Sequence, residues 1–248
     1  MTIRASIVIP AYQEGEAIVP GLERIAAATT IPNEILVVVD SPDDSTVAPV
    51  KRLSKRMPEL RLAVNDYGRG PANAIRYGIA HARAPIVVVT MADGCDDPRQ
   101  VDELVRLVDR GVVVAAASRY MPGGQQVGGP RFNRVLSRAA GRSQQLFANV
   151  GTRDATNSFK AYRKSFVEDV GIESRDGFEI GLELTAKARR RRLPVAEIPT
   201  IWLDRTTGAS NFRVMAWIPK YFRWYRHAFG PRIVADSAIT RPLTPGES

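Results

Sequence analysis

The stretch 87-VVVTMADGCDDP-98 joins a run of residues typical of a buried β-strand to three carboxylates within five positions. Pro98 suits the first position of a helix, and the apolar residues over 98–110 then repeat at helical spacing. A strand that passes through a short polar loop into a helix is the repeating unit of a parallel α/β sheet. This stretch therefore predicts both the fold class and a cluster of negative charge at the end of one strand.

The same alternation of strand and helix extends through the first half of the chain. We expect strands at 6–10, 34–40, 60–64, 85–90 and 112–117, and helices near 16–29, 46–57, 71–83 and 98–110. The strands are almost continuously apolar, which is expected when helices cover both faces of a sheet. The predicted fold is α/β, with a mostly parallel central sheet flanked by helices.

The second half of the chain has a less regular pattern. We expect a Gly-rich loop (121–130), a helix (131–149), an irregular block (150–163), a helix (177–191) and a strand (195–203). Glu179, Glu183 and Lys187 recur every four residues, which predicts ion pairing on an exposed helix. We divide the chain into a catalytic domain (1–211), an amphipathic aromatic-basic helix (212–230) and a poorly ordered tail (231–248).

Composition limits the class of protein. The 248 residues are 44% hydrophobic, which is enough for a sizeable core, and the single cysteine, Cys95, has no partner for an internal disulfide. The N-terminus resembles a first strand more than a signal peptide, and no apolar run is long enough to span a bilayer. We therefore expect a cytoplasmic protein. The net charge of +9 favours nucleotides, nucleic acid, acidic lipid or phosphate esters as partners, and does not choose among them.

The three carboxylates have different expected roles. Asp97 directly precedes Pro98 and is best explained as a helix N-cap. Asp93 and Asp96 have no such explanation, and carboxylate oxygens are the ligands that Mg²⁺ and Mn²⁺ prefer. A solvated acidic loop is the alternative. We predict that Asp93 and Asp96 bind a divalent cation.

Polar loops also follow the other predicted strands, at 10–18, 40–46 and 65–70. Ligands of open α/β sheets bind outside the carboxyl ends of the strands, so these loops and the acidic loop are expected to share one edge. An acidic, Gly-containing edge on a basic protein predicts a site for a metal ion and a phosphate.

Seven segments in sequence carry a resemblance to a known family. They are "VIPAYQE" (8–14), "VVVDSPDDST" (37–46), "GRGPANAIRYGI" (68–79), "MADGCDDP" (91–98), "SRYMPGG" (118–124), "DATNSFKAYRKS" (154–165) and "DRTTGASNF" (204–212). Together they resemble family 2 glycosyltransferases, and the last three resemble the dolichyl- and polyprenyl-phosphate mannose synthase branch. The resemblance covers about residues 3–213.

The resemblance implies a GT-A (nucleotide-diphospho-sugar transferase) fold and a nucleotide-sugar donor. By this analogy, Pro10, Tyr12 and Glu14 line the nucleoside pocket, Asp40 accepts a hydrogen bond from the base, and Arg69 and Gly70 lie near the nucleotide. Ordinary packing for Tyr12 and a turn or cap for Asp40 are the alternatives. The resemblance favours GDP-mannose as the donor, with a UDP-hexose second.

The resemblance also implies a polyprenyl phosphate acceptor and residues that handle phosphate. Arg119, Arg131 and Ser137 match positions that bind the acceptor phosphate, and Arg205 matches one that closes over the pyrophosphate. A phosphate monoester has its second pKa near 6 and is already an anionic nucleophile, so transfer needs no general base. In-line attack would invert the anomeric configuration.

Two positions depart from the family pattern. Ala92 stands where the first metal-binding Asp is usual, which implies a shifted register with Asp93 and Asp96 as ligands. Asn211 replaces a frequent Lys, and one phosphate contact is thereby in doubt.

Three alternatives and one membrane question remain. The enzyme could act on a soluble hydroxyl acceptor with Asp154 as general base, or the chain could be a basic nucleic-acid-binding protein or an inactive scaffold. The acidic strand-end edge argues against nucleic acid. The aromatic and basic residues of 212–229 suit a peripheral membrane helix or a helix packed on the catalytic domain, and a membrane-embedded partner subunit would be compatible with the lipid acceptor.

Overall fold

A seven-stranded sheet forms the centre of the protein in the computed structural model, which describes residues 2–128, 131–204 and 214–233. At 131–133 and 214–218 it describes the backbone alone. In sheet order the strands are β3 (Leu60–Val64), β2 (Asn33–Val39), β1 (Ala5–Pro10), β4 (Ile86–Val89), β7 (Lys160–Arg163), β5 (Val114–Ser118) and β8 (Val195–Pro199). Neighbouring strands are parallel except at β7, so the predicted α/β, mostly parallel sheet is confirmed.

The antiparallel strand β7 lies between β4 and β5, inside the block that the sequence predicts to be irregular. Lys160 is paired with Val89 on one side and with Ala116 on the other. The sequence pattern does not indicate this strand, because Lys160 and Arg163 are charged and charged residues are usually exposed. Both are buried here. Strand β7 therefore brings a buried cation into the centre of the sheet.

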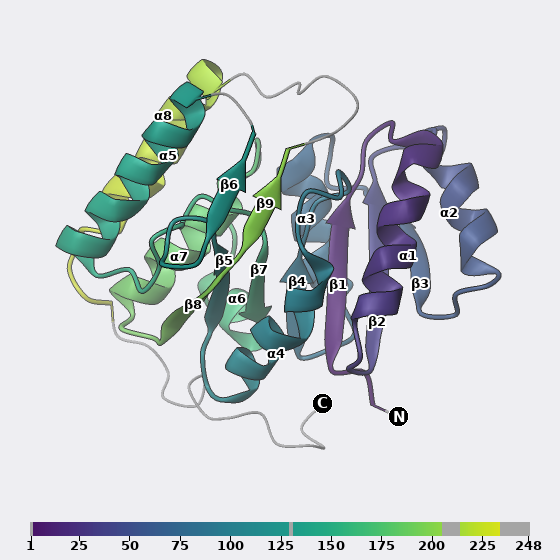
Figure 1. The fold of residues 1–248 in the computed structure, drawn as a ribbon, viewed down its shortest axis with the longest axis horizontal. Coiled ribbons are helices and arrows are strands. Elements are labelled where there is room, and N and C mark those ends of the chain that lie inside the picture. The colour runs from purple at the N-terminus through teal and green to yellow at the C-terminus, as the bar shows by residue number, and fades with distance from the viewer. Residues whose placement is uncertain (1, 129–130, 205–213, 234–248) are drawn as a thin grey trace.

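Helices cover both faces of the sheet (Figure 1). On one face α1 (Ile18–Ala28), α2 (Val47–Ser54) and α4 (Val101–Asp109) bury their apolar sides, and on the other α3 (Pro71–Ala80), α6 (Lys164–Val170) and α7 (Ile180–Arg190) do the same. Helix α1 follows a 3-10 turn, η1 (Gly15–Ala17), and α4 follows another, η2 (Pro98–Gln100). The alternation predicted for the first half is confirmed, with ends that shift by a few residues.

Helix α7 is more buried than the sequence predicts. Glu183 is fully buried and accepts the backbone N–H groups of Glu173 and Ser174, at 2.7 and 2.9 Å, besides its ion pair with Lys187. The expectation of an exposed helix was wrong, because the i,i+4 pair serves to hold the chain before α7 rather than to face water.

A second, two-stranded sheet lies beside the main one. It pairs β6 (Gln125–Val127) with β9 (Ile201–Leu203) in parallel. The sequence predicts one strand over 195–203, but the chain changes sheet at Thr200, whose N–H donates to the Ser118 carbonyl while its own carbonyl accepts from Gln125. The Leu203 N–H then donates to the Cys95 carbonyl at 3.2 Å. This bond connects β9 to the loop after β4 that contains Asp93, Asp96 and Asp97, which we call the carboxylate loop.

Helices α5 (Arg131–Ser143) and α8 (Val214–His227) stand side by side at one end of the molecule (Figure 1). Ser143 and Tyr225 join them through their hydroxyl groups at 2.9 Å. Helix α5 continues into a π-helical turn, η3 (Gln144–Ala148), and α8 contains Pro219 within its length.

Helix α8 packs on α7 of the catalytic domain. Trp224 is 2% exposed, and its ring has Lys187 and Arg223 at 5.2 and 4.8 Å from the centroid. These contacts favour the packed alternative for the aromatic-basic helix, while Phe222 remains 54% exposed. Residues 234–248, where we expect a poorly ordered tail, lie outside the described residues.

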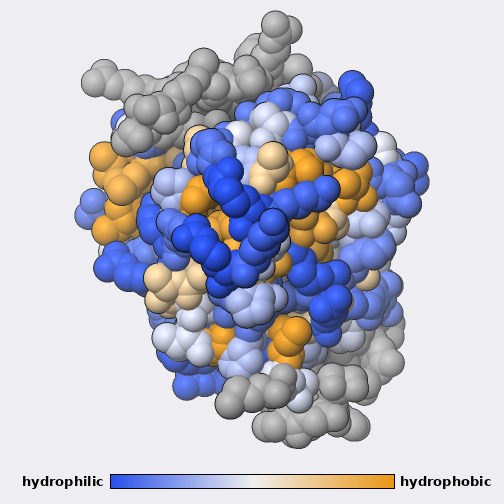
Figure 2. All heavy atoms as spheres, turned by 90° about the vertical axis from the view of Figure 1, so that its right-hand side faces the viewer, coloured by the Kyte–Doolittle hydropathy of each residue, from blue (hydrophilic) through white to orange (hydrophobic). Residues whose placement is uncertain are grey.

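Seen from the side of α2 and β3, hydrophilic residues predominate, with hydrophobic patches between them (Figure 2). Among the described residues, no helix is both long and apolar enough to cross a membrane.

Candidate active site

The loop after β1 holds three of the residues expected at the donor. Pro10 is buried at the end of the strand, Glu14 is half-buried, and Tyr12 is 67% exposed. The loop is held by the one after β2, because Asp44 accepts the Gln13 N–H at 3.0 Å. Tyr12 is thus an exposed ring on a loop whose backbone is constrained.

Asp40, directly after β2, binds both ends of the loop between β3 and α3. Its Oδ1 accepts the Asn65 side-chain amide at 2.8 Å and its Oδ2 accepts the Gly70 N–H at 2.8 Å. Gly70 has φ = 111°, a conformation that favours glycine, and it directly precedes α3. The structure brings Asp40 and Gly70 together beside the exposed Arg69, and the contact of Asp40 with a base stays a prediction.

Asp93 and Asp96 lie close enough for their charges to interact. Asp96 is buried and accepts the Thr90 hydroxyl at 2.8 Å and the Met91 N–H at 3.4 Å, while Asp93 accepts the Cys95 N–H at 3.1 Å. Burial, and then repulsion from Asp93, raise the pKa of Asp96 to about 6. The loop therefore places two interacting carboxylates, one of them desolvated, at the carboxyl end of β4.

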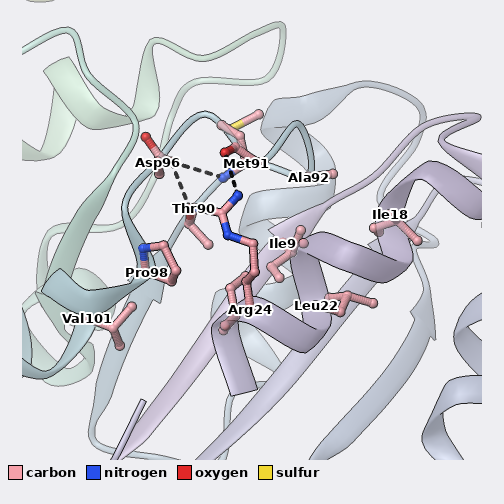
Figure 3. Close-up of a pocket in the computed structure, with 13 residues that line it drawn as sticks. Ile9, Ile18, Leu22, Arg24, Thr90, Met91, Ala92, Asp96, Pro98 and Val101 are labelled. Carbon is pink, nitrogen blue, oxygen red and sulfur yellow. Dashed lines mark hydrogen bonds between the residues drawn. The ribbon is translucent and has the colours of Figure 1, made fainter. Parts of the chain in front are cut away.

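Asp96 also borders a small cavity. Figure 3 shows Asp96 with Thr90 and Met91 above a small cavity whose other walls include Ile9, Leu22 and Val101. The cavity has a volume of about 20 Å³, far below what a nucleotide needs. This cavity is therefore not the nucleotide site.

Asp97 caps the turn that follows. Its side chain accepts the Arg99 N–H at 3.1 Å, and the Arg99 guanidinium, with burial acting in the opposite direction, lowers the pKa of Asp97. The predicted N-cap role is confirmed. Asp97 is therefore committed to the start of η2, which separates it in function from Asp93 and Asp96.

Arg119 and Asp154 form a buried pair at the carboxyl end of β5. Arg119 donates to Asp154 through Nε at 2.7 Å, Nη2 at 2.9 Å and its backbone N at 3.0 Å. Burial alone would raise the pKa of Asp154, but the Arg119 charge outweighs it and the pKa is lowered. The Arg119 charge also acts on Asp96, so the predicted acceptor arginine lies near the carboxylate loop.

Tyr120 connects Arg119 with the predicted acceptor residue on α5. The Arg119 guanidinium lies 5.0 Å from the Tyr120 ring centroid, and the Tyr120 hydroxyl forms hydrogen bonds with Gln126 and with Ser137. Tyr120 thus links Arg119 to Ser137. Arg131 begins α5 with its side chain outside the described part, and Arg205 and Asn211 also lie outside it.

The residues present fit a divalent cation held jointly by protein and substrate. Within 2–128, 131–204 and 214–233, no group of three or more His, Cys, Asp or Glu side chains is placed to hold a metal ion. Mg²⁺ and Mn²⁺ sites that act on nucleotides use one or two carboxylates and complete their shell with phosphate oxygens and water. Burial and then repulsion from Asp93 raise the pKa of Asp96, and a cation would relieve the repulsion, so Asp93 and Asp96 stay the predicted ligands.

Comparison with protein families identifies the class. The profile of glycosyl transferase family 2 matches residues 6–171, about two thirds of the chain. The chain therefore belongs to glycosyltransferase family 2: it is a glycosyltransferase with a GT-A fold.

Two characterised relatives are similar over most of the chain. The polyprenol monophosphomannose synthase of Mycolicibacterium smegmatis is 30% identical over 216 residues, which are 85% of this chain and 81% of the relative. The dolichol-phosphate mannosyltransferase of Pyrococcus furiosus is 28% identical over 92% of this chain. This chain spans only 63% of that relative.

Solved structures with low identity share the fold. A mannosyltransferase from Pyrobaculum calidifontis, in complex with GDP-mannose and Mn²⁺, matches with a TM-score of 0.62 and 22% identity, over 91% of this chain and 63% of that one. A glucosyl-3-phosphoglycerate synthase from Mycobacterium tuberculosis, with Mn²⁺ and UDP, matches with a TM-score of 0.65 and 16% identity, over 95% and 82%. Both were crystallised with Mn²⁺, which is consistent with a divalent cation here.

Several residues of the site escape analysis of the sequence. The sequence indicates no role for Asp44, Tyr120 or Lys160, and it indicates Asp154 only as the general base of the alternative enzyme. Asp44 accepts the Thr46 N–H at 2.8 Å, a contact that the "DDST" turn pattern could have indicated. Asp154 acts through Arg119, 35 residues away, and Tyr120 reaches Ser137 on α5, so neither has a local signal. Lys160 donates to carbonyl oxygens only three to six residues before it, but a lysine in the sequence does not indicate burial.

Proposed function

We propose that this protein transfers mannose from GDP-mannose to a polyprenyl phosphate, with inversion at the anomeric carbon. The observation that carries the proposal is the position of Arg119: its guanidinium lies beside Tyr120, whose hydroxyl bonds to Ser137, and near enough to Asp96 for their charges to interact. This arrangement provides cationic and hydroxyl groups for an acceptor phosphate next to the carboxylates for a donor diphosphate. The two relatives named as mannosyltransferases to prenyl phosphates support the same choice of substrates.

The described site lacks an obvious general base, which suits an acceptor that is already an anion. His81 stacks on Tyr77 at the end of α3, with ring centroids 3.8 Å apart. His227, the last residue of α8, contacts Arg190, the last residue of α7. Asp154 is a poor base, because Arg119 binds both of its oxygens and lowers its pKa. A phosphate acceptor, with its second pKa near 6, supplies its own nucleophilic oxygen.

The carboxylate loop would stabilise the leaving group of the reaction. A divalent cation bound by Asp93 and Asp96 would stabilise the charge that develops on the leaving nucleoside diphosphate. Arg205 is our candidate for a second charge on the same diphosphate. Tyr12, Glu14, Asp40 and Arg69 would contact the nucleoside part, each from a loop at the carboxyl edge of the sheet.

A polyprenyl acceptor places the enzyme at a lipid surface. Leu146 and Phe147 of η3 are 76% and 77% exposed, and Phe222 of α8 adds a third exposed apolar side chain at the same end of the molecule. We propose peripheral attachment at the cytoplasmic face of a membrane through this end. A membrane-embedded partner subunit stays a prediction without a contact to support it.

The test is a transfer assay with purified protein. GDP-mannose or a UDP-hexose is incubated with a polyprenyl phosphate in detergent, with and without Mg²⁺ or Mn²⁺, and the lipid product is separated and its anomeric configuration determined. We expect transfer from GDP-mannose that requires the cation. Transfer from UDP-hexoses alone would correct the donor, and transfer only to soluble hydroxyl acceptors would replace the proposed function with its main alternative.

A further inference from the structure

Asp154 is a fully buried carboxylate in the turn before β7, at the acceptor end of the site. It receives three hydrogen bonds from Arg119, two from the guanidinium and one from the backbone, between 2.7 and 3.0 Å. The backbone bond matters, because it fixes the carboxylate relative to the main chain at the end of β5. The two side-chain bonds then fix the plane of the guanidinium relative to that carboxylate.

The pair uses one edge of the guanidinium and leaves the opposite edge. A guanidinium has five N–H donors in a rigid plane, and Asp154 occupies the edge formed by Nε and Nη2. The remaining donors, two on Nη1 and one on Nη2, point away from that carboxylate. The Arg119 side chain is 13% exposed, so it is not sealed from solvent, and two donors of this second edge suit the oxygens of a phosphate.

Lys160 holds the turn that carries Asp154. Its ammonium is fully buried and donates to the carbonyl oxygens of Ala155, at 3.0 Å, and of Asn157 and Asp154. The Asp154 N–H also donates to the Thr152 hydroxyl at 3.0 Å. The carboxylate therefore sits on a backbone that a buried side chain keeps in place from the opposite side.

We infer that Asp154 is a positioning residue for acceptor recognition: it orients Arg119 so that the Nη1–Nη2 edge meets the phosphate of the lipid. This inference rests on the proposed function and assigns the phosphate-binding geometry of the same site. Asp154 itself touches no substrate. Asp154 therefore affects the affinity for a phosphate acceptor. An arginine that is free to rotate must be ordered when the phosphate binds, and the entropy lost in ordering it reduces the binding free energy.

The test compares three single variants in the full-length protein. Asp154→Asn keeps the shape of the side chain and removes the charge and one acceptor of the bidentate pair. We expect KM for the polyprenyl phosphate to rise about tenfold or more, since hydrogen bonds to charged groups have effects of this order. We expect kcat and the calorimetric Kd for GDP with Mn²⁺ to stay within about twofold, because the donor end is intact.

A matched control is available in the ion pair of Glu197 with Arg153, the residue before Asp154. Glu197 forms a similar pair with Arg153. It accepts hydrogen bonds from the Arg153 Nη1, from the Arg153 backbone N–H at 2.7 Å and from the Thr152 hydroxyl at 3.0 Å. Glu197→Gln removes the same kind of charge from a neighbouring arginine that has no role in the site. We expect its acceptor KM to match wild type, and an equal rise in both variants would overturn the inference by showing a general structural effect.

A double-mutant cycle separates positioning from folding. If Asp154 acts through Arg119, Asp154→Asn adds nothing to the acceptor KM of Arg119→Ala. Additive effects would overturn the inference. Where Asp154→Asn does not fold, Arg119→Lys tests the same pair, because lysine keeps the charge without the fork. A wild-type acceptor KM for Arg119→Lys would then be the contrary result.

The outcomes also distinguish the inference from the function beneath it. A wild-type protein that transfers nothing to polyprenyl phosphate overturns both. An active wild-type protein whose Asp154→Asn variant has a normal acceptor KM overturns the inference alone and leaves the proposed function in place.

Discussion

At the donor end of the site, Tyr12 and Arg69 are exposed side chains on loops whose backbone N–H groups are bound by Asp44 and Asp40. At the acceptor end, Arg119 is itself held in a buried ion pair with Asp154. The proposed donor end thus separates the residues that support the loops from the exposed residues that we expect to contact the ligand, whereas at the proposed acceptor end one residue has both roles. Substitutions at the donor end should affect binding without stability, and those at the acceptor end should affect both.

The largest effect is expected where the two ends meet, at the carboxylate loop. Asp96→Asn should reduce transfer about a hundredfold or more, because the cation loses a charged ligand. Its free energy of unfolding should not fall, since burial and Asp93 already disfavour the charged form of Asp96. Steady-state assays and thermal unfolding check both parts.

The control for this variant lies one position along the chain. Asp97→Asn makes the same chemical change, but Asn serves equally well as an N-cap. Its activity and stability should remain near wild type. Equal losses of activity in the two variants would contradict the separate roles of Asp96 and Asp97.

The acceptor end should show the largest effect on stability at Gly141, where α5 passes close to the chain that leads to Asp154. A Cβ at this position would lie 2.0 Å from the Arg153 carbonyl oxygen. We expect Gly141→Ala to lower the free energy of unfolding by about 1–3 kcal/mol through overpacking. Denaturant unfolding measures the change.

A second helical glycine provides the comparison. A Cβ at Gly21 in α1 would lie 4.0 Å from the Ala92 carbonyl oxygen, an ordinary van der Waals contact, so an added methyl group fits without a clash. Gly21→Ala should raise stability by about 0.5–1 kcal/mol, through helix propensity alone. If both variants lost stability to the same extent, close packing of α5 would not be the cause.

Lys160 should make stability depend on pH. Burial lowers its pKa from 10.5 to about 7, although Asp154 acts in the opposite direction. Between these values the unfolded chain holds a proton that the folded protein lacks, so the free energy of unfolding should increase as the pH rises from about 7 to about 10.5. Lys160→Met should flatten this dependence in urea unfolding series, while the exposed Lys51→Met should not.

The smallest change in stability is expected at the donor end. Tyr12 is 67% exposed, so Tyr12→Ala should alter the free energy of unfolding by no more than about 0.5 kcal/mol. The calorimetric Kd for GDP should nevertheless increase several-fold, because the ring is our candidate for stacking near the base. Unchanged nucleotide affinity would remove Tyr12 from the site.

Much of the donor end could be predicted from the sequence. The strands before Tyr12, Asp40 and Asp93 have local patterns of apolar residues, and parallel strands bring their carboxyl ends to one edge whatever the details of packing. Asp97 was also predictable, because a cap is a contact between near neighbours in the chain.

The acceptor end could be predicted only in part. Arg119 and Ser137 were found through resemblance, but their connection through Tyr120 was not. Asp154 was considered as a base because its sequence neighbours do not reveal Arg119, 35 residues away, which lowers its pKa. Likewise the charges of Lys160 and Arg163 concealed β7, since a sequence pattern treats a charged residue as exposed.

The sequence by itself therefore determined the parallel strand–loop–helix architecture and the edge at which the ligand loops gather. Both follow from periodicities and caps that span a few residues. Only the tertiary structure decided that β7 lies antiparallel between β4 and β5, that Glu183 is buried, and that Asp154 holds Arg119. The reason is physical: a buried charge is tolerated only beside groups that stabilise it, and only the folded chain decides which groups surround it.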